Sequence, residues 1–175
     1  MGNKQTGLKS SPSKGNIKAP GYLASVLPFL EPGDGVTELE AYLRANPDQQ
    51  LNVAQQLANQ STDAQFRRNV VTLGALRILR LLTISDEHNV KLCAVHALGN
   101  LAVDKGNHDD MVSDGCFFNI IDLLSSGKVD LQRKSARAIT NLCVTNDNKH
   151  HFDGLGAIGA LIHLAQHKDE KCRTE

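Results

Sequence analysis

Two histidines near the end of this sequence have the spacing of metal ligands. His163 and His167 lie four residues apart, which on a helix places both imidazoles on one side. No glutamate follows His163 in an H-E-x-x-H arrangement, and Cys172 is the nearest third ligand, so we interpret them as a surface pair with no metal. The phosphate-binding G-x-x-x-x-G-K-[ST] loop, the G-x-S-x-G elbow and the dinucleotide fingerprint are also missing. We therefore predict neither an enzyme nor a bound cofactor.

The first six residues match the M-G-x-x-x-[ST] pattern for N-myristoylation, with Gly2 as the acceptor after removal of Met1. One myristoyl chain binds membranes only marginally and needs a second signal. Residues 1–30 offer a basic one, because they contain no acidic residue and four lysines: Lys4, Lys9, Lys14 and Lys18. This pattern predicts a tail that holds the chain peripherally on the cytosolic face of a membrane. The alternative is a disordered tail without lipid.

Composition narrows the class of function further. Lysine plus arginine equals aspartate plus glutamate at 19 each, so the charge excess of a nucleic-acid-binding protein is absent. Hydrophobic residues make up 41% but aromatic residues only 4%, with no tryptophan, which predicts an aliphatic core. The four cysteines form no C-x-x-C pair, as is typical of reduced thiols in a cytoplasmic protein. No stretch approaches the ~20 apolar residues of a membrane span.

The sequence repeats itself with a period of 41 residues. Glycines 74, 115 and 156 stand at this spacing, and so do several sets of apolar residues: Leu76, Phe117 and Ile158; Leu79, Ile120 and Leu161; Leu82, Leu123 and Leu164; Leu57, Leu98 and Ile139; Val70, Met111 and Phe152. Within each period apolar residues recur three and four apart, as on a buried helix face, and no segment alternates as a strand does. A period of about 40 residues with helical patterning indicates a solenoid.

We expect three short helices in each period. In the period that opens at Gly115 they are Gly115–Leu124, a run from Val129 to Val144, and a brief element around His151–Leu155 after a polar turn at 146–149. The opening glycine suits a chain reversal that needs positive φ. The predicted units are a tail over 1–19, a capping helix over 20–34, a degenerate first repeat over 35–73, full repeats over 74–114 and 115–155, and a truncated repeat over 156–175.

These residues resemble the armadillo repeat. Gly74–Leu82 followed by Val90–Ala102 is similar to the second and third helices of that family, and Ala138–Cys143 repeats the third-helix signature. The resemblance implies an all-α fold, a right-handed α-solenoid of about three repeats with the last truncated. HEAT repeats are the rival assignment, but their units carry a proline-turned first helix and no asparagine ladder. The layout also resembles N-terminally acylated armadillo scaffold proteins, although those carry N-terminal cysteines that this sequence lacks.

The resemblance also implies a groove for a partner protein. In armadillo proteins an asparagine near the end of the third helix hydrogen-bonds the backbone of a bound peptide, and the matching residues here are Asn59, Asn100 and Asn141. An amide both donates and accepts, so it suits a peptide unit, but it equally suits the end of a neighbouring helix. Nuclear import receptors of the family place a tryptophan four residues earlier. This sequence has none, so classical nuclear-signal binding is not expected; the matching residues are Gln55, His96 and Arg137.

Basic residues mark one stretch of this predicted groove, namely Arg133, Lys134 and Arg137. They favour an acidic or phosphorylated ligand segment, although they also fit an ordinary solvated helix face. The function predicted is therefore a cytoplasmic scaffold that binds extended or helical segments of partner proteins. The alternative is a soluble cytoskeletal or axonemal component, or a nuclear-transport or signalling component, without a lipid anchor.

The last period is incomplete. Lys168–Glu175 aligns with Gly127–Lys134, which is the start of a third helix. Solenoid ends normally need a polar cap. We therefore expect either that the chain is a piece of a longer array or that a partner caps the apolar residues Ile158, Leu161, Ile162 and Leu164.

Overall fold

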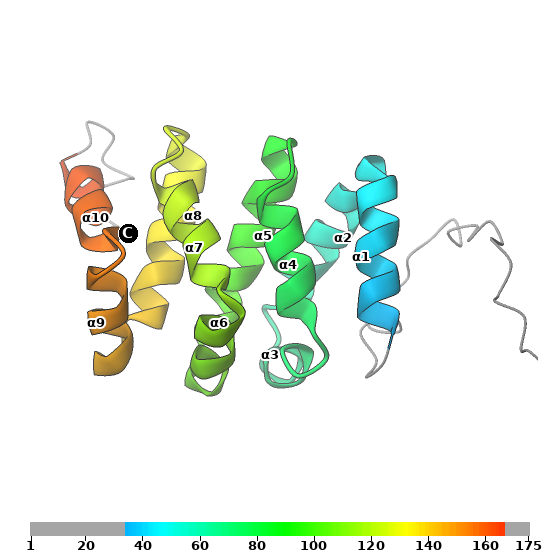
Figure 1. Cartoon of the computed structure of the whole chain (residues 1–175), viewed down its shortest axis with the longest axis horizontal. Coiled ribbons are helices and arrows are strands. Elements are labelled where there is room, and N and C mark those ends of the chain that lie inside the picture. The colour runs from blue at the N-terminus through cyan, green and yellow to red at the C-terminus, as the bar shows by residue number, and fades with distance from the viewer. Residues whose placement is uncertain (1–33, 167–175) are drawn as a thin grey trace, which may run out of the picture.

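The computed structural model describes residues 34–166, which form helices joined by short turns (Figure 1). In chain order the helices are α1 (Gly35–Ala45), α2 (Pro47–Gln60), α3 (Ala64–Val70), α4 (Ala75–Thr83), α5 (His88–Leu101), the 3₁₀ turn η2 (Lys105–Asn107), α6 (His108–Asp114), α7 (Cys116–Leu124), α8 (Val129–Leu142), α9 (Asn146–Asp153) and α10 (Ala157–Ala165). The prediction of an all-α fold is confirmed. The predicted tail over 1–19 and the capping helix lie outside the described residues, except for Asp34 immediately before α1.

Equivalent helices recur at the predicted spacing. Helices α4, α7 and α10 begin 41 residues apart, and so do α2, α5 and α8. The first set, together with α1, forms the nearer layer in Figure 1, and α2, α5 and α8 form the layer behind it. The short helices α3, α6 and α9 lie at one end of these layers. The predicted polar turn at 146–149 is wrong, because these residues are the first half of α9.

The core is aliphatic and centres on α5. Ala94, Val95 and Leu98 have no exposed surface, and α5 packs against α2 on one side and α8 on the other. Among the described residues Phe117 and Phe152 are the only buried aromatic side chains, and their rings meet edge to face at 5.6 Å between centroids. Because side chains three and four apart share a helix face, the sequence pattern alone selects these core residues.

A left-handed glycine opens each period from residue 74 onward. Gly74, Gly115 and Gly156 have φ values of 82°, 81° and 76°, which confirms the predicted chain reversal. Only glycine reaches this region without a steric penalty on Cβ. At Gly74 a Cβ would also lie 2.9 Å from Cγ2 of Val36, so the start of α1 sits directly against this turn.

The C-terminal helix exposes part of its apolar surface, as predicted, but not all of it. Ile158 and Ile162 are 45% and 55% exposed, whereas Leu164 is buried. The prediction for Leu164 is wrong because this side chain lies on the same side of α10 as Ala157 and partly buried Leu161, the side that contacts α7 and α9. A partner that caps the remaining surface stays a prediction.

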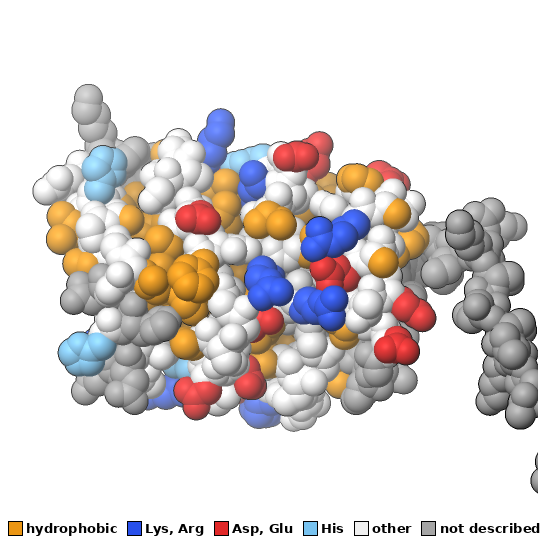
Figure 2. Space-filling model, viewed as in Figure 1, with side chains coloured by type: hydrophobic (Ala, Val, Ile, Leu, Met, Phe, Trp, Pro, Cys, Tyr) orange, Lys and Arg blue, Asp and Glu red, His pale blue; other side chains and the backbone are white. Residues whose placement is uncertain are grey.

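Ion pairs between neighbouring helices neutralise charge on the face where α1 and α4 lie side by side. Figure 2 shows basic and acidic side chains side by side over these helices. Glu40 of α1 pairs with Arg77 of α4 and with Arg44, and Arg80 of α4 lies 3.6 Å from the carboxylate of Asp114. The hydrogen bonds from both Arg44 and Arg77 lower the pKa of Glu40 despite its partial burial. None of the helices within residues 34–166 has the length and apolar character needed to cross a bilayer.

Candidate functional site

All the predicted partner-binding side chains belong to the layer of α2, α5 and α8. We call their shared surface the ladder face; its residues are Gln55, Asn59, His96, Asn100, Arg133, Lys134, Arg137 and Asn141. Small residues let the helices approach closely, since a Cβ placed on Gly99 of α5 would meet the Cβ of Ala138 of α8 at 3.6 Å. The third helices therefore form one continuous layer, and side chains from successive repeats stand next to each other.

The three asparagines of the ladder face have different roles. Asn59 is exposed at the end of α2. Asn100 is buried, and its Nδ2 donates to Oγ of Ser61 at 3.0 Å. Asn141 is half-buried, and its Nδ2 donates to the carbonyl of Gly99 at 2.9 Å. The side chains of Asn100 and Asn141 thus bond each repeat to the preceding one, which favours the alternative that these amides satisfy neighbouring helix ends.

Replacing Asn100 with alanine is therefore expected to act first on stability. Loss of one buried hydrogen bond should lower the free energy of unfolding by about 1 kcal/mol, because Ser61 loses the donor to its buried hydroxyl. Urea unfolding followed by circular dichroism measures the change. The matched control is Asn59→Ala, whose exposed side chain should cost less than about 0.5 kcal/mol. Equal stability of the two variants would contradict a linking role for Asn100.

The basic residues of the ladder face gather at the junction of α5 and α8. Arg133, Lys134 and Arg137 are half-buried along one side of α8. Within residues 34–166, neither Lys134 nor Arg137 has a carboxylate at ion-pair distance, in contrast to the arginines on α4. Burial lowers the pKa of His96 on α5, and the positive charges of Lys134 and Arg137 lower it further. Both cations therefore lie close enough to the imidazole of His96 to add to the effect of burial.

The titration of His96 tests whether the charges of Lys134 and Arg137 act on its imidazole. We expect its pKa, followed by the ring proton signals in NMR, to lie below the usual value of about 6.5. Replacing Lys134 and Arg137 with glutamine should raise that pKa, because two like charges are removed and only the effect of burial remains. A titration that is identical in both proteins would show that these charges do not act on His96.

Two further residues line this end of the ladder face and are not apparent from sequence patterns. Nε2 of His88, at the start of α5, lies 2.7 Å from Oδ2 of Asp130 at the start of α8. Partial burial opposes ionisation of Asp130, but hydrogen bonds from His88 and from the backbone N–H of Leu131 prevail and lower the pKa of the carboxyl. Beside this pair lies an open pocket of about 420 Å³, which Arg133 also lines. The separation of His88 and Asp130, 42 residues, is close to the period of 41, which is consistent with positions in adjacent repeats but does not by itself identify the pair.

Charge is distributed unequally along the ladder face. Helix α2 carries amides such as Gln55, which is exposed, and Asp48 is its single charged residue. Helix α8 carries three basic residues and Asp130. The surface therefore passes from neutral amides at the N-terminal end to positive charge at the C-terminal end.

The described residues contain no group of three or more histidine, cysteine, aspartate or glutamate side chains that could hold a metal ion. His167 and Cys172, which complete the metal set weighed from the sequence, lie outside them. Burial raises the pKa of the thiols of Cys93, Cys116 and Cys143, so these cysteines are held as neutral thiols rather than reactive thiolates.

Solved structures share this arrangement, whereas no protein family and no curated protein matches the sequence. An engineered protein is 23% identical with a TM-score of 0.70, over 78% of this chain and 57% of its own. A designed armadillo repeat protein in complex with the peptide (KR)4 is 22% identical with a TM-score of 0.66, over 70% of this chain and 53% of its own. A computationally designed armadillo repeat protein for modular peptide recognition is 23% identical with a TM-score of 0.70, over 74% of this chain and 56% of its own. The fold is that of an armadillo-repeat solenoid, and the chain spans just over half the length of these structures.

Proposed function

We propose that this chain is a non-catalytic scaffold whose ladder face binds an extended segment of a partner protein, with acidic or phosphorylated residues over α8. The observation that carries the proposal is the cluster of half-buried basic side chains around His96, where Lys134 and Arg137 have no carboxylate partner within the described residues. A partly desolvated cation without a counter-ion favours an anionic ligand.

The armadillo fold supports an extended protein segment as the ligand. Stacked third helices offer a long surface with repeated polar side chains, which suits a chain with repeated peptide units. The designed armadillo protein that is similar to this chain was solved with a peptide of alternating lysine and arginine. The ladder face described here has the opposite preference, because its C-terminal end is itself positive and would repel such a peptide.

A charge series of peptides tests the proposed function. Fluorescence anisotropy with the full chain would compare fluorescein-labelled 12-residue peptides that are acidic, phosphoserine-containing, neutral or (KR)-repeating. We expect the acidic and phosphorylated peptides to bind and their affinity to fall as salt rises through 0.5 M, because screening weakens exposed charge pairs. Tighter binding of the basic peptide than of the acidic one would contradict the proposal.

We further propose that Gly2 is myristoylated and that the lysines of the tail assist membrane contact. Support comes from the sequence pattern and from the need of a single acyl chain for a second, electrostatic signal. Coexpression with an N-myristoyltransferase and intact-mass measurement should show the acyl increment in the wild type and not in Gly2→Ala. Flotation with vesicles containing phosphatidylserine should then separate the two proteins. Equal flotation would leave the soluble scaffold as the surviving alternative.

A further inference from the structure

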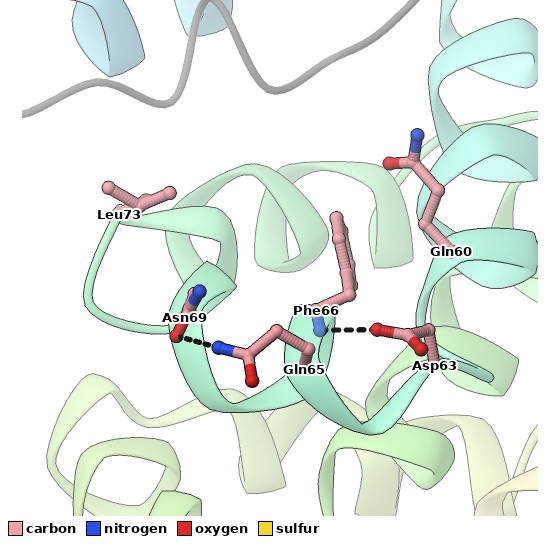
Figure 3. A pocket seen from close by; sticks show the side chains of 6 residues that line it. All are labelled: Gln60, Asp63, Gln65, Phe66, Asn69 and Leu73. Carbon is pink, nitrogen blue, oxygen red and sulfur yellow. Dashed lines mark hydrogen bonds between the residues drawn. The ribbon is translucent and has the colours of Figure 1, made fainter.

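The first short helix, α3, has an open pocket beside it, between the end of α2 and the turn before α4. We propose that residues 22–30 of the same chain dock into it and complete the first repeat. The pocket has a volume of about 420 Å³ and is lined by Gln60, Asp63, Gln65, Phe66, Asn69 and Leu73. In Figure 3 the Phe66 ring points into the space between Leu73 and Gln60, and both apolar side chains are only half-buried.

In the later repeats an asparagine occupies the position that is equivalent to Phe66. Nδ2 of Asn107, directly before α6, donates to the carbonyl of Arg67 on α3 at 3.1 Å and to that of Leu101 at 3.0 Å. Asn148 on α9 repeats both contacts, because its Nδ2 donates to the carbonyl of Leu142 at 2.8 Å and lies 3.4 Å from Nδ1 of His108 in the preceding repeat. Each short helix is thus bonded to the repeat before it. Phe66 stands 41 residues before Asn107, so the first repeat has an apolar ring where the others have this amide.

The residue at the end of the third helix, which forms one wall of the pocket, also differs between the first repeat and the later ones. Leu101 and Leu142 are 1% and 0% exposed, whereas the matching residue of the first repeat is Gln60, on the pocket wall. Its Oε1 is buried and accepts no hydrogen bond from the described residues. A buried acceptor without a donor is costly. An occupant with backbone N–H groups next to apolar side chains fits this wall better than a purely apolar one.

The adjacent part of the chain has the reach and the composition of this occupant. Val36 at the start of α1 lies against Gly74, next to pocket residue Leu73. Val36 follows Leu30 by six positions, a stretch that spans up to ~20 Å when extended. The segment itself is predominantly apolar: Tyr22, Leu23, Ala24, Ser25, Val26, Leu27, Pro28, Phe29 and Leu30.

The repeat register points to the same segment. The buried apolar residue of each described short helix is Val70, Met111 or Phe152, at most 1% exposed. Counting back 41 residues from Val70 reaches Phe29, and counting back the 40 that separate the starts of α1 and α4 reaches Leu30. Either count places a large apolar residue of the segment where the other repeats bury one.

The test uses the full chain with the segment made polar by Phe29→Asp and Leu30→Asp. Amide hydrogen exchange should become at least about tenfold faster in α3 and remain unchanged in α8, because protection reports local opening. The matched control is Ile17→Asp, an apolar-to-acidic change in the tail outside the segment, and it should leave both helices unchanged. Equal exchange in α3 for the wild type and the double variant would overturn the proposal.

A milder double-mutant cycle distinguishes docking from general damage to the fold. Phe29→Ala, Phe66→Ala and the combined variant should each retain helicity, and each single change should lower the melting temperature by about 4 °C or more. If the two rings share one site, the second substitution adds much less than it does alone; additive shifts would overturn docking. Protection of α3 should not change on tenfold dilution. Loss of protection on dilution would assign the pocket to a second copy of the chain instead.

Discussion

Lys134→Glu combined with Arg137→Glu is expected to weaken the binding of an acidic 12-residue peptide by about 100-fold. Each half-buried cation that contacts a carboxylate contributes roughly 1–1.5 kcal/mol, and two such losses correspond to about two powers of ten in Kd. Reversal of the charges adds repulsion at the same positions. Fluorescence anisotropy in low-salt buffer measures the change, and the salt dependence of the remaining binding should become flatter.

The control for this variant is Arg68→Glu combined with Lys105→Glu. Both residues are exposed, and they lie on α3 and η2 rather than on the ladder face. The control changes net charge by the same amount, so it separates a local site from long-range attraction. If both variants lose affinity equally, the acidic peptide recognises the overall charge of the chain and not the junction of α5 and α8.

Leu98→Ala should cause the largest loss of stability, about 3 kcal/mol in the free energy of unfolding. Leu98 has no exposed surface and belongs to α5, which packs against both α2 and α8. Truncation leaves a cavity in the middle of the solenoid, and because each repeat is supported by its neighbours, the loss affects two interfaces at once. Urea unfolding should show a lower midpoint.

The matched control is Ile84→Ala, which removes a side chain that is 62% exposed and should change stability by no more than about 0.5 kcal/mol. A loss of less than about 1 kcal/mol in Leu98→Ala would contradict the central position of α5 in the core. Comparison with the charge variant is also informative, because Lys134 and Arg137 should affect peptide binding with little effect on unfolding.

The helices themselves could be predicted from the sequence because their signals are local. Apolar residues three and four apart mark the buried face of α7 and α8, and a period of 41 marks their recurrence. Gly115 could be assigned to a reversal for the same reason, since its backbone conformation excludes other side chains. The error at α9 has a local cause as well. The run Asn146–Lys149 has the composition of a turn, but within the helix Asn148 is buried and its amide contacts Leu142 and His108.

The candidate site was predicted less completely, since side-chain roles depend on partners in other repeats. Position along the third helix predicted one groove for His96, Lys134 and Arg137, and in the structure the two cations act on the pKa of His96. The same reasoning could not predict that the amide of Asn100 donates a hydrogen bond to Ser61 or that His88 pairs with Asp130. Those contacts join residues 39 and 42 apart, so they depend on how far one repeat is shifted against the next.

The period in the sequence thus determined the class of fold and the residues of its core, because burial of a helix face follows from spacing alone. The spacing of His163 and His167 alone did not indicate a metal site, because no third ligand follows in the arrangement that a metal site requires. Which polar groups stay available to a ligand was decided by tertiary structure. When the repeats stack, the amide of Asn100 hydrogen-bonds to Ser61 of the preceding repeat. Lys134 and Arg137 have no carboxylate partner within the described residues, and the pocket beside Phe66 on α3 is open. A hydrogen bond or an ion pair requires two groups within about 3–4 Å, and only the assembled repeats bring such groups together.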